Sequence, residues 1–596
     1  MNLTGLDWSI IIAFFVLSLG VGLAVARKAG SSSSEFFLSG RNMPWWLLGV
    51  SMVATTFSAD TPNLVTDIVR QNGVAGNWVW WAFLLTGMLT VFVYAKLWRR
   101  SGASTDLEFY EMRYSGKPAA FLRGFRAIYL GVVFNVLIMA TVTLAMIKIA
   151  GILLGLSPVQ TVVIGGTITV TYSALGGLRG VIITDFFQFI IAMIGAIGAA
   201  VVAVQHPDVG SLSNLLTHEN VVDSLSLLPS FSDTDMVISL LIIPLAVQWW
   251  SIWYPGAEPG GGGYVAQRML SAKSERHAIG ATFLFNVAHY ALRPWPWIIV
   301  ALCSMIVFPD LQSLREAFPN IDDSIVGHDL AYPAMLSFLP QGLLGLVVAS
   351  LIAAYMSTIS THLNWGASYL VNDFYKRFIN PTASESQQVN FGRLSTVGLM
   401  ILASLFALAL SDALGAFQIL LQIGAGTGLL FILRWFWWRI NAFSEITAMT
   451  VSFLIAIYFQ LAHEQLGFEA IPSQTQFLFG VGMTTICWII ATYLTRTTDR
   501  KTLFSFYKLV QPGGPGWKGV MDQAAALGES LEPTGRKWDV PQGVLMMLLG
   551  SVGVYAALFA TGSLLYGETT QGSMLIMLSL ICGGGIAKLW QSMVTD

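Results

Sequence analysis

Charge is scarce in this chain of 596 residues, because Asp, Glu, Lys and Arg together make up 11% of it and hydrophobic residues 55%. This composition excludes a soluble globular protein and is typical of a polytopic membrane protein. The net charge of -2 indicates no nucleic-acid partner. Cysteine is also rare, and the three present lie in apolar runs without the spacing of a metal or redox site: Cys303, Cys487 and Cys582.

Long apolar runs are abundant instead. A run of roughly 18 or more apolar residues is long enough to cross a bilayer as a helix, and we count about fifteen such runs. The chain is therefore predicted to be an all-α membrane protein. The predicted helices lie near 8–26, 44–69, 75–97, 125–154, 158–174, 181–204, 236–254, 278–308, 334–371, 394–411, 414–433, 441–462, 475–495, 541–563 and 573–591.

The Lys and Arg residues between these runs fall mostly on one side of the predicted membrane. By the positive-inside rule this side is the cytoplasm, so the amino terminus lies outside and the carboxyl terminus inside. An odd number of helices satisfies that orientation. We expect a multi-pass protein of the cell (inner) membrane, with acidic outer loops at 206–235 and 309–332.

Two apolar runs contain residues that do not belong in a membrane helix. One break reads Phe57-Ser58-Ala59-Asp60-Thr61-Pro62, and the other reads Trp253-Tyr254-Pro255-Gly256-Ala257-Glu258-Pro259, followed by four glycines. Non-helical backbone is tolerated at membrane depth only where it lines a cavity or is buried in protein. Paired breaks of this kind predict the midplane binding site of a secondary transporter.

Each break opens a set of about five runs, and the second set begins on the opposite side of the membrane, which indicates an inverted repeat. The later segment at 497–540 is too short for a separate catalytic domain. The predicted division is an accessory helix in 1–40, a first repeat in 41–205, an extracellular loop in 206–235, a second repeat in 236–440, and accessory helices in 441–596 with a cytoplasmic linker at 497–540.

A polar stripe follows one face of a helix in the second repeat. Ala354, Ser357, Thr358 and Thr361 recur at i, i+3, i+4 and i+7. Hydroxyl and carbonyl oxygens are ligands that a small hard cation prefers. The same spacing suits a packing face of small residues, and spacing alone favours that explanation. The first break favours a cation site over a packing face, because carbonyls of unwound helices coordinate sodium in transporters of this kind.

Three acids lie where a membrane helix does not normally carry charge. Asp185 stands at the start of an apolar run, where a charge costs at least about 2.5–3.5 kcal/mol and needs a partner or a role. An interfacial cap beside Arg179 explains it equally well. Asp60 and Glu258 lie in the two breaks and either contact a polar solute or only cap the half-helices.

His289 and Arg293 are one helical turn apart in another apolar run. An arginine in such a run faces a cavity or an acid far more often than lipid, and pairing with Glu258 or Asp60 is the purely structural alternative. No nucleophile–base pair and no cluster of metal ligands converges in the sequence, so we predict no catalytic residues and no enzyme.

Several segments together resemble the sodium:solute symporter family, which includes sodium-coupled sugar, proline and sialic acid transporters. They cover the chain from about 40 to 440. The matching segments are Gly40-Arg41-Asn42-Met43-Pro44-Trp45-Trp46, Ala54 to Asp60, Tyr172-Ser173-Ala174-Leu175-Gly176-Gly177-Leu178 running to Thr184-Asp185, Gln267-Arg268-Met269-Leu270-Ser271-Ala272-Lys273, and Ala353 to Thr361 with Asn372-Asp373-Phe374-Tyr375.

The resemblance implies a LeuT-like five-plus-five inverted repeat with one extra amino-terminal helix and about four extra carboxyl-terminal helices. It also implies a main sodium site made by three carbonyls and two hydroxyls, those of Ala54, Phe57, Ala354, Ser357 and Thr358. Some members hold a second sodium, and the matching residues here are Asp185, Ser357, Ser360 and Thr361.

The substrate site departs from the family pattern. Asp60 and Thr61 stand where the sugar-binding bacterial member has an acid and an amide, His289 replaces a lysine, and Trp80 replaces another acid. Fold and sodium coupling therefore transfer better than substrate identity. The predicted substrate-binding residues are Asp60, Thr61, Trp80, Glu258, His289, Arg293 and Gln422.

These observations predict a sodium-coupled symporter that imports a small polar organic solute. Mixed donors and acceptors suit a sugar or sugar derivative, whereas a carboxylate would bind Arg293 in a bidentate manner. A symporter of an amino acid or small carboxylate is the alternative, and a solute-binding membrane sensor is a second one from another class. The expected partners are the solute, sodium and the lipid bilayer, with no nucleic acid, in a monomer or a loose oligomer.

Overall fold

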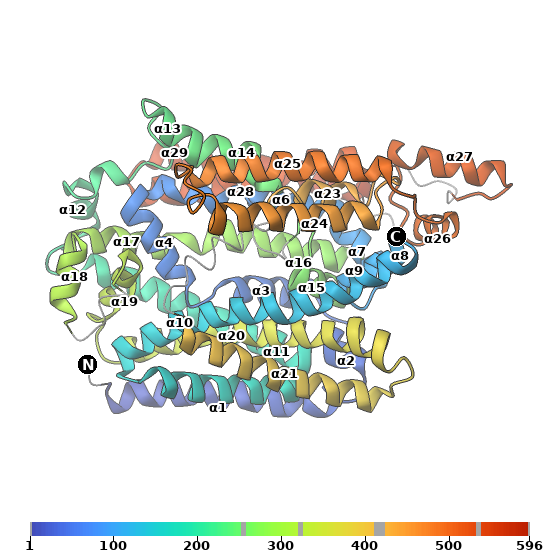
Figure 1. Cartoon of the computed structure of the whole chain (residues 1–596). Coiled ribbons are helices and arrows are strands. Elements are labelled where there is room, and N and C mark those ends of the chain that lie inside the picture. The colour runs from blue at the N-terminus through green and yellow to red at the C-terminus, as the bar shows by residue number, and fades with distance from the viewer. Residues whose placement is uncertain (1–2, 252–257, 320–325, 411–423, 532–537, 594–596) are drawn as a thin grey trace.

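The computed structural model describes the chain except residues 1–2, 252–257, 320–325, 411–423, 532–537 and 594–596, which Figure 1 draws in grey. The described residues contain eleven helices that are long and apolar enough to cross a membrane, and two shorter apolar helices at Trp45–Thr56 and Thr234–Trp250. The predicted all-α membrane class is therefore confirmed.

The first half of the chain contains the first break. Its helices are α1 Gly5–Ala29, α2 Ser33–Leu38, α3 Trp45–Thr56, α4 Thr61–Asn72, α5 Trp78–Trp81, α6 Leu84–Leu89, α7 Ala95–Ser101, α8 Phe109–Arg113, α9 Gly116–Ile128, α10 Asn135–Leu154, α11 Pro158–Val204, α12 Leu212–Thr217, α13 Thr234–Val237 and α14 Ile243–Ala246.

The second half begins with the helix that follows the second break. Its helices are α15 Gly263–Ser271, α16 Glu275–Val287, α17 Pro294–Val307, α18 Leu311–Ala317, α19 Ala331–Leu336, α20 Leu343–Tyr369, α21 Glu385–Ala409, α23 Gly428–Leu433, α24 Ala442–Ile457, α25 Ser473–Leu494, α26 Arg500–Val510, α27 Lys518–Ala526, α28 Val540–Leu565 and α29 Thr569–Met593.

The 47-residue α11 consists of two legs rather than one straight helix, because its backbone at Gly177 is non-helical, with φ 52° and ψ -159°. Gly165 in the first leg approaches Tyr355 of α20, and Gly198 in the second leg approaches Leu343 of the same helix. A straight helix from 165 to 198 would extend about 50 Å, far more than the roughly 18 Å between 343 and 355. The chain therefore folds back at Gly177, and the predicted runs at 158–174 and 181–204 form the two legs.

The first predicted break is present. α3 ends at Thr56 and α4 begins at Thr61, with Phe57 at ψ 71° and Pro62 in the first turn of α4. The second break separates α14 from α15, and residues 252–257 within it lie outside the described residues. After it, Gly260 has a φ of +87° and its backbone lies against the ring of Tyr94, where a Cβ would come within 3.0 Å of the ring.

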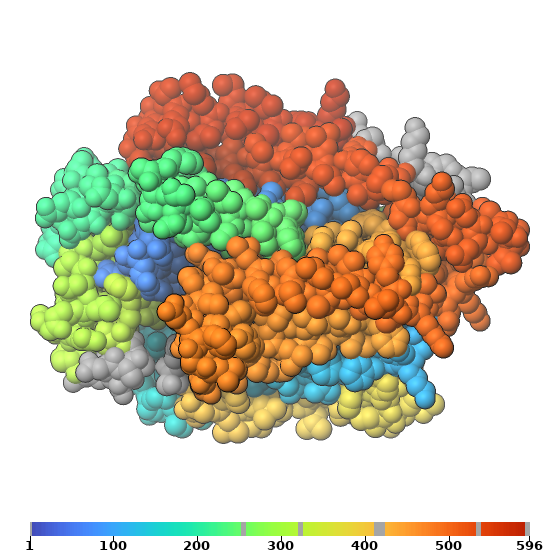
Figure 2. Space-filling view, turned by 45° about the horizontal axis from the view of Figure 1, so that its top comes forward, coloured from blue at the N-terminus to red at the C-terminus, as the bar shows by residue number. Residues whose placement is uncertain are grey.

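The two ends of the chain lie at opposite ends of the helix bundle (Figure 1). The N marker lies at the same end of the bundle as α18 and α19, whereas the C marker lies at the end with α8 and α26. This arrangement fits an odd number of crossings. Figure 2 shows the carboxyl-terminal helices α24 and α25 on one face of the molecule and residues 500–526 standing out at one end.

The segment predicted as a linker at 497–540 contains two packed helices. The indole of Trp517 between them is fully buried and donates from Nε1 to the carbonyl of Trp435 at 2.9 Å. Arg113 of α8 also lies 4.9 Å from the centre of the Trp517 ring. The described part of this segment is therefore packed against Trp435, which follows α23, rather than extended.

Candidate functional site

The polar face of α20 lies inside the protein, at the end of the first broken helix. Ala354, Ser357, Thr358 and Thr361 are all buried. The Thr358 hydroxyl lies 2.8 Å from the carbonyl oxygen of Thr55 in α3 and 3.2 Å from that of Ala354. One hydroxyl therefore joins the two elements that the sequence predicted to meet.

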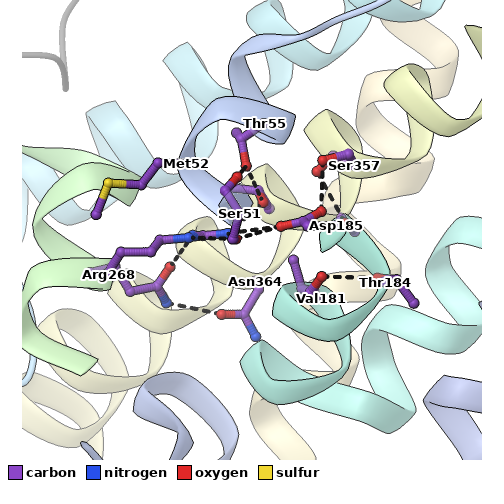
Figure 3. A network of polar contacts seen from close by, with 12 residues as sticks. Ser51, Met52, Thr55, Val181, Thr184, Asp185, Arg268, Ser357 and Asn364 are labelled. Carbon is purple, nitrogen blue, oxygen red and sulfur yellow. Dashed lines mark hydrogen bonds and ion pairs between the residues drawn. The ribbon is translucent and has the colours of Figure 1, made fainter. Parts of the chain in front are cut away.

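Asp185 in the second leg of α11 is fully buried beside this contact (Figure 3). Its Oδ2 accepts a hydrogen bond from Ser51 of α3 at 2.5 Å, and its Oδ1 accepts one from Ser357 of α20 at 2.7 Å. Arg268 Nη2 lies 3.8 Å from Oδ2. Asp185 is thus an interior carboxylate that joins three helices, which removes the alternative of an interfacial cap beside Arg179.

Arg268 of α15 is a site residue that is not among the ligands predicted from the sequence. It is fully buried and donates to Thr361 Oγ1 at 2.7 Å and to Gln267 Oε1 at 3.0 Å. Gln267 in turn donates to Asn364 Oδ1 at 2.9 Å. The sequence contained a signal for it, since an arginine inside a short apolar stretch directly after a helix break requires a buried acid.

Among the predicted sodium ligands, the Thr358 hydroxyl lies 3.2 Å from the Ala354 carbonyl, and several of the other oxygens have partners of their own. The carbonyl of Ala54 accepts from Phe57 N at 3.1 Å. Ser357 is turned toward Asp185, and Ser360 Oγ donates to the carbonyl of Ser357 at 3.1 Å. Each carbonyl oxygen has a second lone pair, so this donor set of hard oxygens fits a sodium ion.

A second polar group occupies the other side of the end of α3. Thr56 Oγ1 lies 3.0 Å from His289 Nδ1 and receives a hydrogen bond from Arg293 Nη1 at 3.2 Å. Arg293 Nη2 lies 3.1 Å from His289 Nε2. Because a guanidinium can only donate, Nε2 accepts, and the imidazole proton is assigned to Nδ1. His289 is neutral in this arrangement.

The predicted substrate residues Asp60, Thr61 and Trp80 lie around this group. Asp60 lies near Arg293 without forming an ion pair with it within 4.0 Å, and its Oδ1 is a buried oxygen without a hydrogen-bond partner in the described structure. Thr61 Oγ1 is 3.4 Å from the carbonyl of Thr56. The Trp80 ring meets the ring of His289 edge-on, with their centres 5.7 Å apart.

Glu258, another predicted substrate residue, is not part of this group. Glu258 is buried and forms an ion pair with Arg126 of α9, and its carbonyl accepts from Gly261 N at 2.9 Å. Its neighbour is therefore an arginine of the first repeat rather than Arg293. Gln422 lies outside the described residues.

Broken helices that meet at buried oxygens and charges define a multi-pass membrane transporter. The family model "Sodium:solute symporter family" matches residues 36–451. The chain belongs to this family, and sodium is its coupling ion.

Two relatives extend this result. The chain is 26% identical over 481 residues to the sodium/glucose cotransporter of Vibrio parahaemolyticus, covering 77% of this chain and 85% of that relative. It is 24% identical over 471 residues to the sodium/mannose cotransporter of Bos taurus, covering 74% and 76%. Each is a sodium-coupled transporter by name.

A solved structure of a Na+-coupled sialic acid symporter in a substrate-bound outward-open state has the same fold. Its TM-score is 0.65 at 20% identity, over 84% of this chain and 100% of that one. This likeness confirms the predicted LeuT-like architecture.

Proposed function

We propose that this sodium:solute symporter imports a sugar or sugar derivative across the cell (inner) membrane, with its amino terminus outside and its carboxyl terminus in the cytoplasm. The named sugars of the two relatives support this solute class. So do the carboxylate, guanidinium and aromatic rings around Thr56, because sugars combine hydroxyl donors and acceptors with apolar faces.

The observation that carries the proposal is that adjacent residues at the end of α3 serve both polar groups. The Thr55 carbonyl meets the Thr358 hydroxyl, and the Thr56 hydroxyl meets His289 and Arg293. Successive residues of a helix point about 100° apart. An ion that fixes Thr55 against α20 therefore also fixes Thr56 in the solute site.

In this proposal sodium is bound by the carbonyls of Ala54, Phe57 and Ala354 and by the Thr358 hydroxyl, with Ser357 shared between this site and Asp185. Asp185, Ser360 and Thr361 form the second candidate ion site. Each sodium that enters gains about 2.3 kcal/mol per 100 mV of inside-negative potential. A tenfold solute gradient costs about 1.4 kcal/mol, so one ion suffices to accumulate a neutral solute.

Uptake of labelled glucose, mannose and galactose into proteoliposomes tests the proposal. With an inward sodium gradient, internal solute should exceed the external concentration, and the excess should disappear when potassium replaces sodium. Equal uptake in potassium would overturn sodium coupling. Binding without sodium-driven accumulation would favour the alternative of a membrane sensor.

A further inference from the structure

Six arginines are buried in the described structure, and five of them have an evident reason to be there. Four lie within 4.0 Å of a carboxylate, namely Arg123, Arg126, Arg268 and Arg434. Arg113 donates instead to the backbone carbonyls of Arg434 and Trp437. Arg293 is the sixth, and among the described residues it has neither a carboxylate within 4.0 Å nor a carbonyl from another helix.

The hydrogen bonds of Arg293 leave part of its guanidinium unused. Nε donates to the carbonyl of His289, Nη1 to Thr56 and Nη2 to His289 Nε2. A guanidinium has five N–H groups, so one remains on each Nη. Thr56 and His289 have no further acceptor for these N–H groups. The Thr56 hydroxyl accepts from Arg293 Nη1 and His289 Nδ1 and donates to the carbonyl of Val53 at 3.0 Å. His289 Nε2 already accepts from Arg293 Nη2.

The charge of this group is also incomplete. His289 is neutral in its assigned tautomer, the Trp297 ring lies 5.3 Å from the Arg293 guanidinium, and the nearby Asp60 carboxylate is more than 4.0 Å from it. A buried charge without a close partner is costly, and a protein retains one where a ligand supplies the partner. The two free N–H groups match the two oxygens of a carboxylate.

Asp60 indicates a second group on the solute, a hydrogen-bond donor. Its buried Oδ1 has no hydrogen-bond partner in the described structure, although the Ser58 hydroxyl lies near this carboxylate. A sugar hydroxyl supplies a donor. From the two free N–H groups of Arg293 and the unpartnered oxygen of Asp60 we infer that the solute is a sugar acid. Its carboxylate binds Arg293, and a ring hydroxyl donates to Asp60. This inference rests on the proposed sodium-coupled sugar transport and narrows its solute class.

The test compares glucuronate and galacturonate with their parent sugars glucose and galactose. Binding to the purified full chain in sodium is measured by calorimetry, and sodium-driven uptake is measured in proteoliposomes. We expect the acids to bind at least about tenfold more tightly than the parent sugars, as one charge-assisted hydrogen bond provides. Alanine and glutamate are included, because an ammonium group could also bind Asp60.

Three variants separate recognition from folding. Arg293→Gln should weaken acid binding about 10- to 100-fold and neutral-sugar binding by clearly less, so the preference for the acids over the parent sugars falls. Arg293→Lys keeps the charge and should retain part of the preference. Arg27→Gln, at an exposed position in the last turn of α1, is the matched control and should leave both unchanged. Thermal stabilisation by sodium shows that each variant is folded.

The outcomes are distinct for the two proposals. Sodium-driven uptake of glucose or galactose without binding of either acid would overturn the sugar-acid inference and leave the symporter proposal standing. Tighter binding of alanine or glutamate, or an equal loss of acids and neutral sugars in Arg293→Gln, would also overturn the inference. Binding of the acids without sodium-driven uptake would support the Arg293 site and overturn symport.

Discussion

Arg268 in α15 and Arg293 just before α17 are two buried arginines that contact the same broken helix, yet their surroundings differ. Arg268 contacts Ser51 of α3 and has Asp185 as its counter-ion, with Thr361 and Gln267 accepting further bonds. Arg293 contacts Thr56 of α3 and has no carboxylate within 4.0 Å in the described structure. The hydrogen-bond network of Arg268 is complete, whereas Arg293 has N–H groups without an acceptor in the described structure.

This difference separates a group that holds helices together from a group that receives a solute. A complete ionic network keeps its members in place, because removing any one leaves a buried charge unpaired. An incomplete network has the opposite property, since its free donors gain their partners only when a ligand arrives. In the proposed function, the same helix end therefore carries a fixed contact and a solute contact at neighbouring residues.

The largest expected effect is the difference in stability between the glutamine variants of the two arginines. Arg268→Gln should lower the free energy of unfolding by about 3–5 kcal/mol, because Asp185 loses its counter-ion. Arg293→Gln should change it by less than about 1 kcal/mol, since the replacement removes a charge that has no close partner. Thermal unfolding of the purified variants in detergent measures the contrast. Equal destabilisation by the two variants would show that Arg293 has a structural role like that of Arg268.

A smaller effect on stability is expected at Glu258, which forms an ion pair with Arg126. Glu258→Gln keeps the side-chain shape but removes the charge, so it should destabilise the protein by about 2–3 kcal/mol while leaving the KM for solute unchanged. The exposed Glu464→Gln is the control. A rise in the solute KM of Glu258→Gln but not of Glu464→Gln would indicate that Glu258 belongs to the solute site.

The parts of the site that follow from local pattern were predictable. Hydroxyls at helical spacing placed Thr358 and Ser357 on one face, and the break after Phe57 placed free carbonyls opposite them. The family resemblance related these two segments to each other. The observed contact between Thr358 and Thr55 is one residue away from the predicted carbonyl of Ala54, because the last turn of a helix decides which carbonyl faces outward.

The pairing of buried charges was not predictable in the same way. Arg126 and Glu258 are 132 residues apart, and nothing in the local sequence of either one specifies the other. Both Asp60 and Glu258 occur in breaks, so the sequence grouped them with the solute site. In the structure Glu258 pairs with Arg126 instead, since the packing of whole helices selects which charges meet.

A moderate effect on ion affinity is expected at Thr358, which belongs to the contact between α20 and α3. Thr358→Ala should raise the sodium concentration needed for half-maximal uptake about tenfold, because one hard oxygen is lost. Thr358→Ser keeps the hydroxyl and should restore most of the affinity. Thr396→Ala is a matched control, since Thr396 is buried and its hydroxyl only bonds to the carbonyl of Gly392 in its own helix. Unchanged sodium dependence in Thr358→Ala would separate this hydroxyl from the ion site.

The smallest expected effect is at Trp80, which borders the incomplete network without donating to it. Its indole Nε1 donates to Asn77 Oδ1 at 2.8 Å, and its ring stacks on Tyr290 with centres 5.9 Å apart. Trp80→Phe should raise the solute KM about threefold through the smaller aromatic surface and leave the sodium dependence unchanged. Trp8→Phe, on the exposed side of α1, is the control. If Trp80→Phe alters sodium dependence as strongly as solute KM, the two groups at the end of α3 are not separable, because the ring then acts on both through the position of the helix.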